Sequence, residues 1–218
     1  MKKVIIVDDH PIVRQGFVLL INQEDDLDVI GEAEDAPGAL SLIRDKKPDL
    51  ALVDLSLKNS NGLELIKDLK IIHPELLILV VSLHDEDVYA ERALRAGAKG
   101  FIMKAEATDN VMVAIREVLS GGVYLSSAMR SKILNNLSGG PVSKPRIVTE
   151  MLSDREFEVF QLIGNGLNTR SIADKLNLSI KTIETYKSHL KNKLDLHDAT
   201  EMIQYAVEWV VKNNQYTG

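Results

Sequence analysis

The first 120 residues alternate short apolar runs, rich in β-branched residues, with amphipathic stretches of helical period. The apolar runs lie at residues 4–8, 27–34, 50–55, 76–82 and 99–104. The helical stretches lie at residues 11–22, 36–46, 62–72, 86–96 and 108–120. This alternation predicts a doubly wound α/β domain with a five-stranded parallel sheet. Because the first, third and fourth runs are almost continuously apolar, we expect helices on both faces of the sheet.

The remainder of the chain has a different character. Residues 121–148 carry four basic residues and no acidic one, and they contain a Gly-Gly-Pro turn and a second proline after a short helical pattern. Such composition is typical of a linker. The predicted organisation is therefore a first domain at residues 1–122, a linker with a short helix at 123–148 and a second domain at 149–218.

Residues 149–218 show helical patterns and no convincing strand. Ser153 and Glu156 form the spacing of a capping box, which opens the first helix. Two further stretches, 168–176 and 179–194, are separated by Asn177 and Leu178, the spacing of a helix-turn-helix. A fourth amphipathic stretch, DATEMIQYAVEWVV, follows. Its apolar residues, Tyr205 and Val207 among them, fit either a dimer surface or core packing. We predict a small all-α domain of four helices.

Polar residues follow the predicted strands of the first domain at one end. Asp8 and Asp9 follow the first strand, and Asp54 follows the third. Ser82 ends the fourth, and Lys104 follows the fifth. Ligands of open α/β sheets bind beyond the carboxyl ends of the strands, so we expect these five side chains to converge.

Three converging carboxylates raise one another's pKa unless a cation neutralises them. Oxygen ligands of this kind suit a small hard ion, Mg²⁺ first and Mn²⁺ second. With Lys104 opposite, the arrangement would hold a phosphoryl group. Each residue alone has a plainer interpretation: an aspartate as a solvated turn or helix cap, the lysine as a surface residue. His10 beside the acids is interpreted as a helix start or surface residue.

The motifs DDH, VDL, Ser82 and RAGAKGFIMK, in this order, resemble the receiver domain of bacterial response regulators over residues 1–120. That resemblance implies a flavodoxin-like fold and makes Asp54 the acceptor of a phosphoryl group from a histidine kinase. Asp8, Asp9, Asp54 and the backbone carbonyl of Ser56 would bind Mg²⁺. The remaining roles that the resemblance implies are phosphoryl contact by Lys104 and a switch pair, Ser82 and Phe101.

Two positions depart from the usual receiver pattern. Leu57-Lys58 stands where the family often has Met-Pro, which puts the lifetime of the phosphoryl group in doubt but removes no ligand. Phe101 replaces a frequent Tyr, losing a phenolic hydrogen bond while leaving ring rotation available; a plain core role for Phe101 is the alternative.

A basic segment marks the helix-turn-helix. Residues 168–194 contain six Lys and Arg residues against Asp174 and Glu184, whereas the whole chain has a net charge of −6. A basic helix in an acidic protein suggests a polyanion partner. Helical period would turn Ile180, Ile183, Leu190 and Leu194 inward. It would turn a mixed polar set outward, namely Lys181, Glu184, Thr185, Lys187, Ser188 and Lys191. A solvated charged face is the alternative.

The stretch from LSDREFEVF to HLKNKL resembles the LuxR/NarL-type DNA-binding domain along nearly its whole length. The resemblance makes 179–194 the recognition helix on double-stranded DNA. Base edges would face Glu184, Thr185 and Ser188, and the lysines would contact phosphate or purine. The DNA-binding set that it implies is Lys181, Thr182, Glu184, Thr185, Lys187, Ser188 and Lys191.

Together the two halves predict a NarL/LuxR-like response regulator that controls transcription. We expect a sensor histidine kinase, DNA and RNA polymerase as partners, and a homodimer on phosphorylation. Apart from its own phosphorylation and dephosphorylation we expect no enzymatic activity. The alternatives are a DNA-binding regulator that phosphorylation does not affect and a Mg²⁺-dependent phosphohydrolase, for which the first strand lacks the D-x-D motif.

Two absences in the sequence bear on where the protein works. The chain has no cysteine, so it has neither disulfides nor thiolate metal sites. No apolar run approaches the roughly 20 residues that span a membrane, and the start lacks the pattern of a signal peptide. We expect a cytoplasmic protein without membrane contact.

Overall fold

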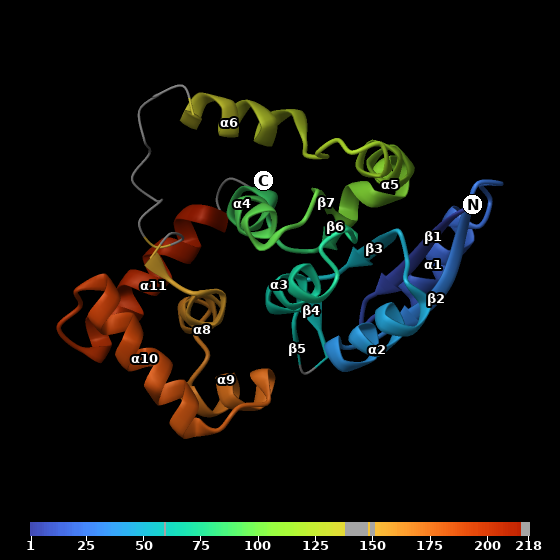
Figure 1. The fold of residues 1–218 in the computed structure, drawn as a ribbon. Helices are drawn as coiled ribbons and strands as arrows, with labels where there is room; N and C mark the ends of the chain where they lie inside the picture. The colour runs from blue at the N-terminus through green and yellow to red at the C-terminus, as the bar shows by residue number, and fades with distance from the viewer. Residues whose placement is uncertain (59, 138–147, 149–150, 215–218) are drawn as a thin grey trace. The chain divides into compact units, whose positions relative to one another are not determined.

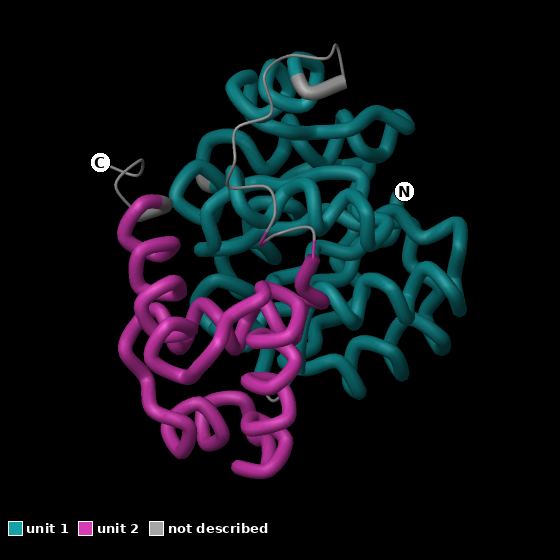
Figure 2. The backbone as a smooth tube through the Cα atoms, turned by 90° about the vertical axis from the view of Figure 1, so that its left-hand side faces the viewer, with its two compact units in different colours: residues 1–138 teal, residues 139–218 magenta. Residues whose placement is uncertain are grey.

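The structure, a computed structural model, describes residues 1–58, 60–137, 148 and 151–214. The chain forms two compact units, residues 1–138 and 139–218 (Figure 2). Most of the predicted Gly-Pro linker, at 138–147, lies outside the described residues. The predicted domain bounds at 122 and 149 stay predictions.

The first unit contains the predicted five-stranded parallel sheet (Figure 1). The strand order is β2-β1-β3-β6-β7. The strands are β1 (Lys2–Val7), β2 (Leu27–Ala33), β3 (Leu50–Val53), β6 (Leu77–Ser82) and β7 (Gly100–Met103). Every residue of β3 is buried, as expected for a strand covered on both faces.

Helices cover both faces of this sheet (Figure 1). They are α1 (Pro11–Ile21), α2 (Ala36–Lys46), α3 (Gly62–Ile72), α4 (Glu86–Ala96) and α5 (Lys104–Leu119). On one face, Phe17 and Ile21 of α1 and Val111 and Ile115 of α5 join alternate strand residues in one apolar core. Alternate residues of a strand point to opposite faces, so the other strand residues face α2, α3 and α4. The α/β prediction is confirmed.

Two local features differ from the sequence prediction. Helix α5 begins at Lys104, four residues before the predicted start at 108, because β7 already ends at Met103. A two-stranded hairpin, β4 (Ser56–Leu57) and β5 (Ser60–Asn61), follows β3. Strands of two residues are too short to show a period, so periodicity could not predict this hairpin.

Another helix of the first unit, α6 (Ser127–Leu137), is attached to α4. The Ser126 N–H donates to Glu86 Oε1 over 2.9 Å, and Lys132 Nζ lies 3.0 Å from Asp87 Oδ1. Met129 is buried. The first turn of α4 is therefore fixed to α6 at both main-chain and side-chain level.

The described part of the second unit is helical: α8 (Asp154–Gly164), α9 (Thr169–Leu176), α10 (Ile180–Leu194) and α11 (Ala199–Asn214). The predicted capping box at Ser153 and Glu156 is present. Phe157 and Phe160 of α8 pack edge-on against Trp209, at centroid distances of 5.2 and 5.9 Å. The four-helix prediction is confirmed.

One predicted core position in α10 is wrong. Ile183 and Leu190 are buried as predicted, but Ile180 is 53% exposed. Ile180 is the first residue of the helix after the Ser179 cap, at the end where the helix adjoins the turn. Periodicity alone overestimates burial at such an end.

None of the helices in the described part of the chain combines the length and the apolar character that crossing a bilayer requires.

Candidate functional site

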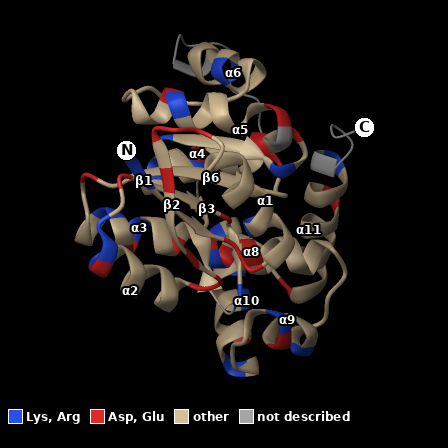
Figure 3. Ribbon diagram, turned by 90° about the vertical axis from the view of Figure 1, so that its right-hand side faces the viewer, with Lys and Arg blue, Asp and Glu red and all other residues tan. Residues whose placement is uncertain are grey.

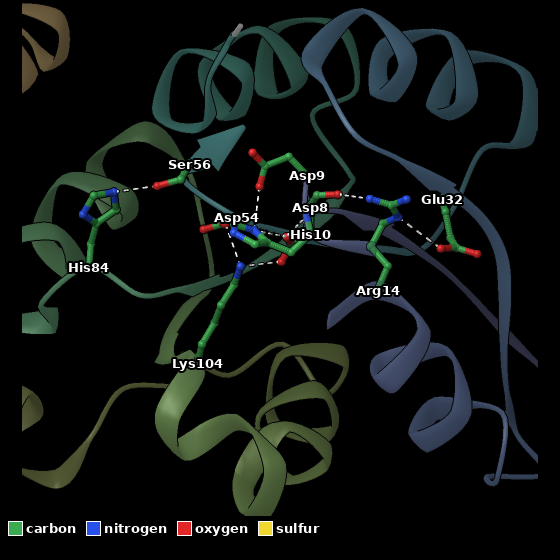
Figure 4. Close-up of polar contacts among 9 residues, drawn as sticks. All are labelled: Asp8, Asp9, His10, Arg14, Glu32, Asp54, Ser56, His84 and Lys104. Carbon is green, nitrogen blue, oxygen red and sulfur yellow. Dashed lines mark hydrogen bonds and ion pairs between the residues drawn. The ribbon is translucent and has the colours of Figure 1, made fainter. Parts of the chain in front are cut away.

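Three of the predicted residues meet where β1, β3 and β7 end. Lys104 Nζ lies 2.6 Å from Asp8 Oδ2 and 2.7 Å from Asp54 Oδ2 (Figure 4). The three side chains are almost fully buried, with exposed fractions of 7% for Lys104, 3% for Asp8 and 1% for Asp54. Parallel neighbouring strands bring Asp8 and Asp54 together, and the early start of α5 turns Lys104 toward them.

The ammonium group leaves part of the carboxylate cluster unsatisfied. Asp54 Oδ1 is buried and has no hydrogen-bond partner. Asp9 is only partly buried, at 30% side-chain exposure, and its Oδ1 lies 2.7 Å from His10 Nδ1. One lysine therefore holds the Oδ2 atoms of two aspartates, while Asp54 Oδ1 stays without a hydrogen bond.

Burial sets the electrostatics of this cluster. Burial raises the pKa of Asp54 and outweighs the lowering effect of Lys104, and the neighbouring Asp8 charge adds to the rise. The pKa of Lys104 is raised, because its two carboxylate partners outweigh the cost of burying it. The cluster thus favours additional positive charge beside Asp54.

The donor set fits a small divalent ion. Asp8, Asp9, His10 and Asp54 each offer an atom, and these atoms lie within 4.8 Å of one another. Carboxylate oxygens are the ligands that Mg²⁺ prefers, and the unpartnered Asp54 Oδ1 would gain a partner. The Ser56 N–H bonds the Asp54 carboxylate, so Ser56 also lies at this site.

The predicted switch residues, Ser82 and Phe101, form no direct bond to Asp54 among the described contacts. Ser82 and Phe101 are completely buried. The Ser82 hydroxyl accepts the His84 N–H over 3.3 Å. His84 Nε2 lies 3.0 Å from Ser56 Oγ (Figure 4). The His84 ring also stacks on the Tyr89 ring.

Three residues that shape the site were not predicted from the sequence: Arg14, Gly62 and His84. Arg14 donates to the Asp8 backbone oxygen and pairs with Glu32. A Cβ at Gly62 would lie 2.4 Å from the Asp54 carbonyl oxygen, so glycine lets α3 begin directly against the acidic strand end. The Asn-Gly pair at 61–62 was an available signal for that turn; Arg14 and His84 gave none.

The predicted DNA-binding residues lie along α10. Among them Lys181, Glu184, Thr185 and Ser188 are exposed, whereas Thr182, Lys187 and Lys191 are partly buried. Basic residues recur over α9 and α10 in Figure 3. All of the predicted DNA-binding residues therefore lie on α10, and their contacts with DNA stay a prediction.

Some of these residues are already engaged with one another. Thr169 Oγ1 donates to Glu184 Oε1 over 2.9 Å, and Lys187 Nζ lies 3.0 Å from Thr169 Oγ1 and 3.1 Å from Glu184 Oε1. Hydrogen bonds from Lys187 and Thr169 lower the pKa of Glu184. This polar triad joins the start of α9 to the middle of α10.

The other end of α10 is fixed by a buried acid. Glu156 of α8 is 5% exposed in its side chain and lies 2.7 Å from Lys193 Nζ. It also caps Ser153 N over 2.8 Å. Burial raises the pKa of Glu156, but the hydrogen bonds from Lys193 and Ser153 lower it further, so its net shift is downward.

Two family models match the chain. Residues 4–116 match the response regulator receiver domain. Residues 150–206 match the bacterial regulatory proteins of the luxR family.

Whole proteins give the same result. The oxygen regulatory protein NreC of Staphylococcus haemolyticus is 33% identical over 94% of this chain and 97% of its own length. NreC of Staphylococcus carnosus is 34% identical, with the same coverage. A solved structure of RcsB from Salmonella enterica serovar Typhimurium, bound to promoter P1flhDC with the phosphomimetic BeF3⁻, is similar at TM-score 0.65. That match has 29% identity and covers 94% of this chain and 98% of the RcsB chain.

Proposed function

The chain belongs to the response regulators that join a receiver domain to a luxR-family DNA-binding domain, and from this membership we propose that Asp54 is its phosphoacceptor. The observation that carries the proposal is the Lys104 bridge: one buried ammonium holds Asp8 and Asp54 while Asp54 Oδ1 has no partner. Both features suit a carboxylate that reacts with an anionic phosphoryl group.

The proposed reaction is a transfer from a phosphohistidine of a sensor kinase. The Asp54 carboxylate attacks phosphorus, forming an O–P bond, while the bond from phosphorus to the donor's imidazole nitrogen breaks. Lys104 neutralises phosphoryl oxygens and is already held at the correct end of the sheet. Asp8, Asp9, Asp54 and the Ser56 carbonyl would hold Mg²⁺, or Mn²⁺, which supplies further neutralisation of charge.

In the proposed mechanism, the conformational response begins with the negative charge that phosphorylation adds at Asp54. An aspartyl phosphate carries about −1.5 to −2 charges, and Ser82 and Phe101 rearrange in answer. To move a regulator from 1:99 to 99:1 in favour of its active form, the phosphoryl group must favour that form by about 5.5 kcal/mol. The activated protein dimerises and presents two α10 helices to half-sites about one helical turn apart.

The DNA contacts belong to the same proposal. Lys181, Lys187 and Lys191 approach phosphates or purines, and the exposed Glu184, Thr185 and Ser188 face base edges. Thr182 completes the set at the start of α10. A cytoplasmic site of action, a histidine kinase and RNA polymerase as partners, and domains at 1–122 and 149–218 complete the proposal.

The phosphoacceptor is tested by labelling with acetyl phosphate and Mg²⁺. Wild type and the control Asp45→Asn, an exposed aspartate of α2, should incorporate one phosphoryl group. Asp54→Asn should incorporate none, as read by intact mass. Incorporation into Asp54→Asn at the wild-type rate would refute the assignment.

DNA dependence is tested by selecting binding sites with protein prepared with and without beryllofluoride. We expect tighter binding and a paired half-site in the beryllofluoride sample. Identical sites and affinities in both samples would instead support a regulator whose DNA binding phosphorylation does not affect.

A further inference from the structure

The His10 ring is turned into the acidic cluster. Its Nδ1 lies 2.7 Å from Asp9 Oδ1 and 3.1 Å from Asp8 Oδ1, and the labelled ring lies among the three aspartates in Figure 4. Half of the ring remains exposed, at 51% of the side chain. A nitrogen donor therefore stands at the solvent side of an otherwise oxygen-rich site.

The local sequence explains this direction. His10 is the N-cap residue of α1, yet its side chain makes no capping hydrogen bond. The next residue, Pro11, has no N–H to cap and keeps His10 in an extended conformation, seen as φ −94° and ψ 106°. The His10 backbone N–H instead donates to Asp8 Oδ1 over 2.8 Å, which holds the ring beside the carboxylates.

The cluster offers a mixed donor set. One atom each from Asp8, Asp9, His10 and Asp54 lies within 4.8 Å of the others. Independently, Asp54 is 2% exposed and its Oδ1 has no hydrogen-bond partner. Mg²⁺ takes oxygen ligands almost exclusively, whereas imidazole nitrogen suits borderline transition metals.

We propose that His10 Nδ1 is a direct ligand of the divalent ion at this site, so that the receiver binds a nitrogen-accepting ion such as Co²⁺ through His10 and Mg²⁺ through its oxygens alone. The proposal deepens the proposed function and rests on it, since both place a divalent ion beside Asp54. It adds a residue to the ligand set and a preference among metals.

A second histidine provides a matched control. His84 is also near the site, but its Nε2 bonds Ser56 Oγ and its ring stacks on Tyr89 at a centroid distance of 4.4 Å. His84 does not belong to the group of donors within 4.8 Å. Removing it changes the surroundings of the site without removing the proposed nitrogen ligand.

The first experiment measures the Kd of Co²⁺ and of Mg²⁺ by calorimetry on untagged wild type, His10→Ala and His84→Ala. Transition metals bind most nitrogen and oxygen sites more tightly than Mg²⁺. The diagnostic quantity is therefore how each substitution changes the ratio of the Co²⁺ Kd to the Mg²⁺ Kd. We expect His10→Ala to weaken Co²⁺ by roughly 10-fold to 100-fold, the size of effect seen when metal-site groups are removed. Mg²⁺ should change by less than about twofold, since its oxygen ligands remain.

The second experiment reads the ligand itself. Pulsed electron paramagnetic resonance of the Co²⁺ complex should show ¹⁴N modulation in wild type and His84→Ala, and none in His10→Ala. Equal weakening of Co²⁺ and Mg²⁺, or ¹⁴N modulation that survives in His10→Ala, would overturn the proposal. Equal tightening of both ions would also overturn it, because His10 would then be only a counter-cation that the metal displaces.

Labelling with acetyl phosphate and Mg²⁺ separates this proposal from the proposed function. If Asp54 of His10→Ala is labelled as in wild type but the metal ratio is unchanged, the ligand proposal fails and the phosphoacceptor stands. If the ratio changes as expected but wild-type Asp54 is never labelled, the ligand proposal stands and the phosphoacceptor fails.

Discussion

Each unit contains a lysine that bridges two polar partners, but the two bridges differ in burial. Lys104 joins Asp8 and Asp54 with side-chain exposures of 7% or less. Lys187 joins Glu184 and Thr169 at 21% exposure, and Glu184 itself is 55% exposed. The attraction between two opposite charges is strong when both are buried and weak when water reaches them. A buried charge left without a partner therefore costs more free energy than an exposed one.

The pKa shifts of the acids follow this difference. The pKa of Asp54 is raised because burial outweighs Lys104, whereas the pKa of Glu184 is lowered because Lys187 and Thr169 act with little burial. The receiver therefore holds an acid that favours a further cation. The helical unit holds an acid that is 55% exposed and whose charge Lys187 already balances.

The largest expected effect comes from Lys104→Met, which leaves Asp8 and Asp54 without their shared cation. In EDTA we expect the first unit to lose about 3 kcal/mol of unfolding free energy, the range for breaking a buried ion pair. Mg²⁺ should restore part of it by binding the folded form. Hydrogen exchange of β1 and β3 amides measures the change.

The control for that variant is Lys132→Met, which removes an exposed pair with Asp87 and should cost less than about 0.5 kcal/mol. A loss below about 1 kcal/mol for Lys104→Met would mean that burial does not distinguish the two bridges.

The second largest effect is expected at the buried acid of the helical unit, Glu156. Glu156→Ala removes both the Lys193 pair and the cap on Ser153, and should lower stability by about 2 kcal/mol. Trp209 is the only tryptophan in the chain and packs on Phe157, so its fluorescence in urea reports this unit. Glu208→Ala, on an exposed pair with Lys212, is the control and should change little.

The third effect, on the order of 1 kcal/mol at pH 7, concerns the sign of the pH dependence. The folded-state pKa of Asp54 is raised, so its contribution is fully present below its ordinary pKa of 3.8 and is lost as pH rises above that value. Asp54→Asn should therefore gain stability over wild type as pH rises from 3.8, measured without divalent ions.

The opposite sign is expected at Glu156, whose pKa is lowered. Its contribution is present above the ordinary pKa of 4.5 and is lost as pH falls below it. The stability difference between wild type and Glu156→Gln should shrink as the solution is acidified from pH 4.5. Differences of the same sign at the two acids would show that their environments are alike.

The smallest effect is expected on DNA binding. Lys181→Ala should weaken binding to all sequences by less than about 1 kcal/mol and reduce the salt slope by about 1. Lys187→Ala should reduce the slope less, because Glu184 already neutralises Lys187. Equal salt slopes for the two variants would show that Lys187 leaves Glu184 and Thr169 when DNA binds. Fluorescence anisotropy at several salt concentrations makes the measurement.

Strand-end residues could be predicted from the sequence because topology fixes them. Asp8 and Asp54 follow neighbouring parallel strands, so few arrangements keep them apart. Side chains on turns and helix ends could not be predicted in this way. The direction of His10 depends on Pro11, and His84 bonds Ser56, which lies 28 residues earlier in the chain. Ile180 is exposed because it lies at the helix end. Periodicity encodes none of these three features.

Helix α10 shows the same limit. Its period placed Glu184 and Lys187 on the outward face, but not their contact with Thr169, which lies 15 and 18 residues earlier in the chain. Such contacts depend on how two helices cross. The sequence thus predicted the fold and the acidic cluster, and left the polar partners of exposed residues to the structure.

The attachment of α6 to α4 has a practical consequence for building chimeras. A receiver joined to a foreign effector directly after residue 122 would lack the Ser126 bond to Glu86, the Lys132 pair with Asp87 and the burial of Met129. Grafts that keep the chain through residue 137 retain these contacts. Domain swaps between related regulators should therefore be spliced on the far side of α6.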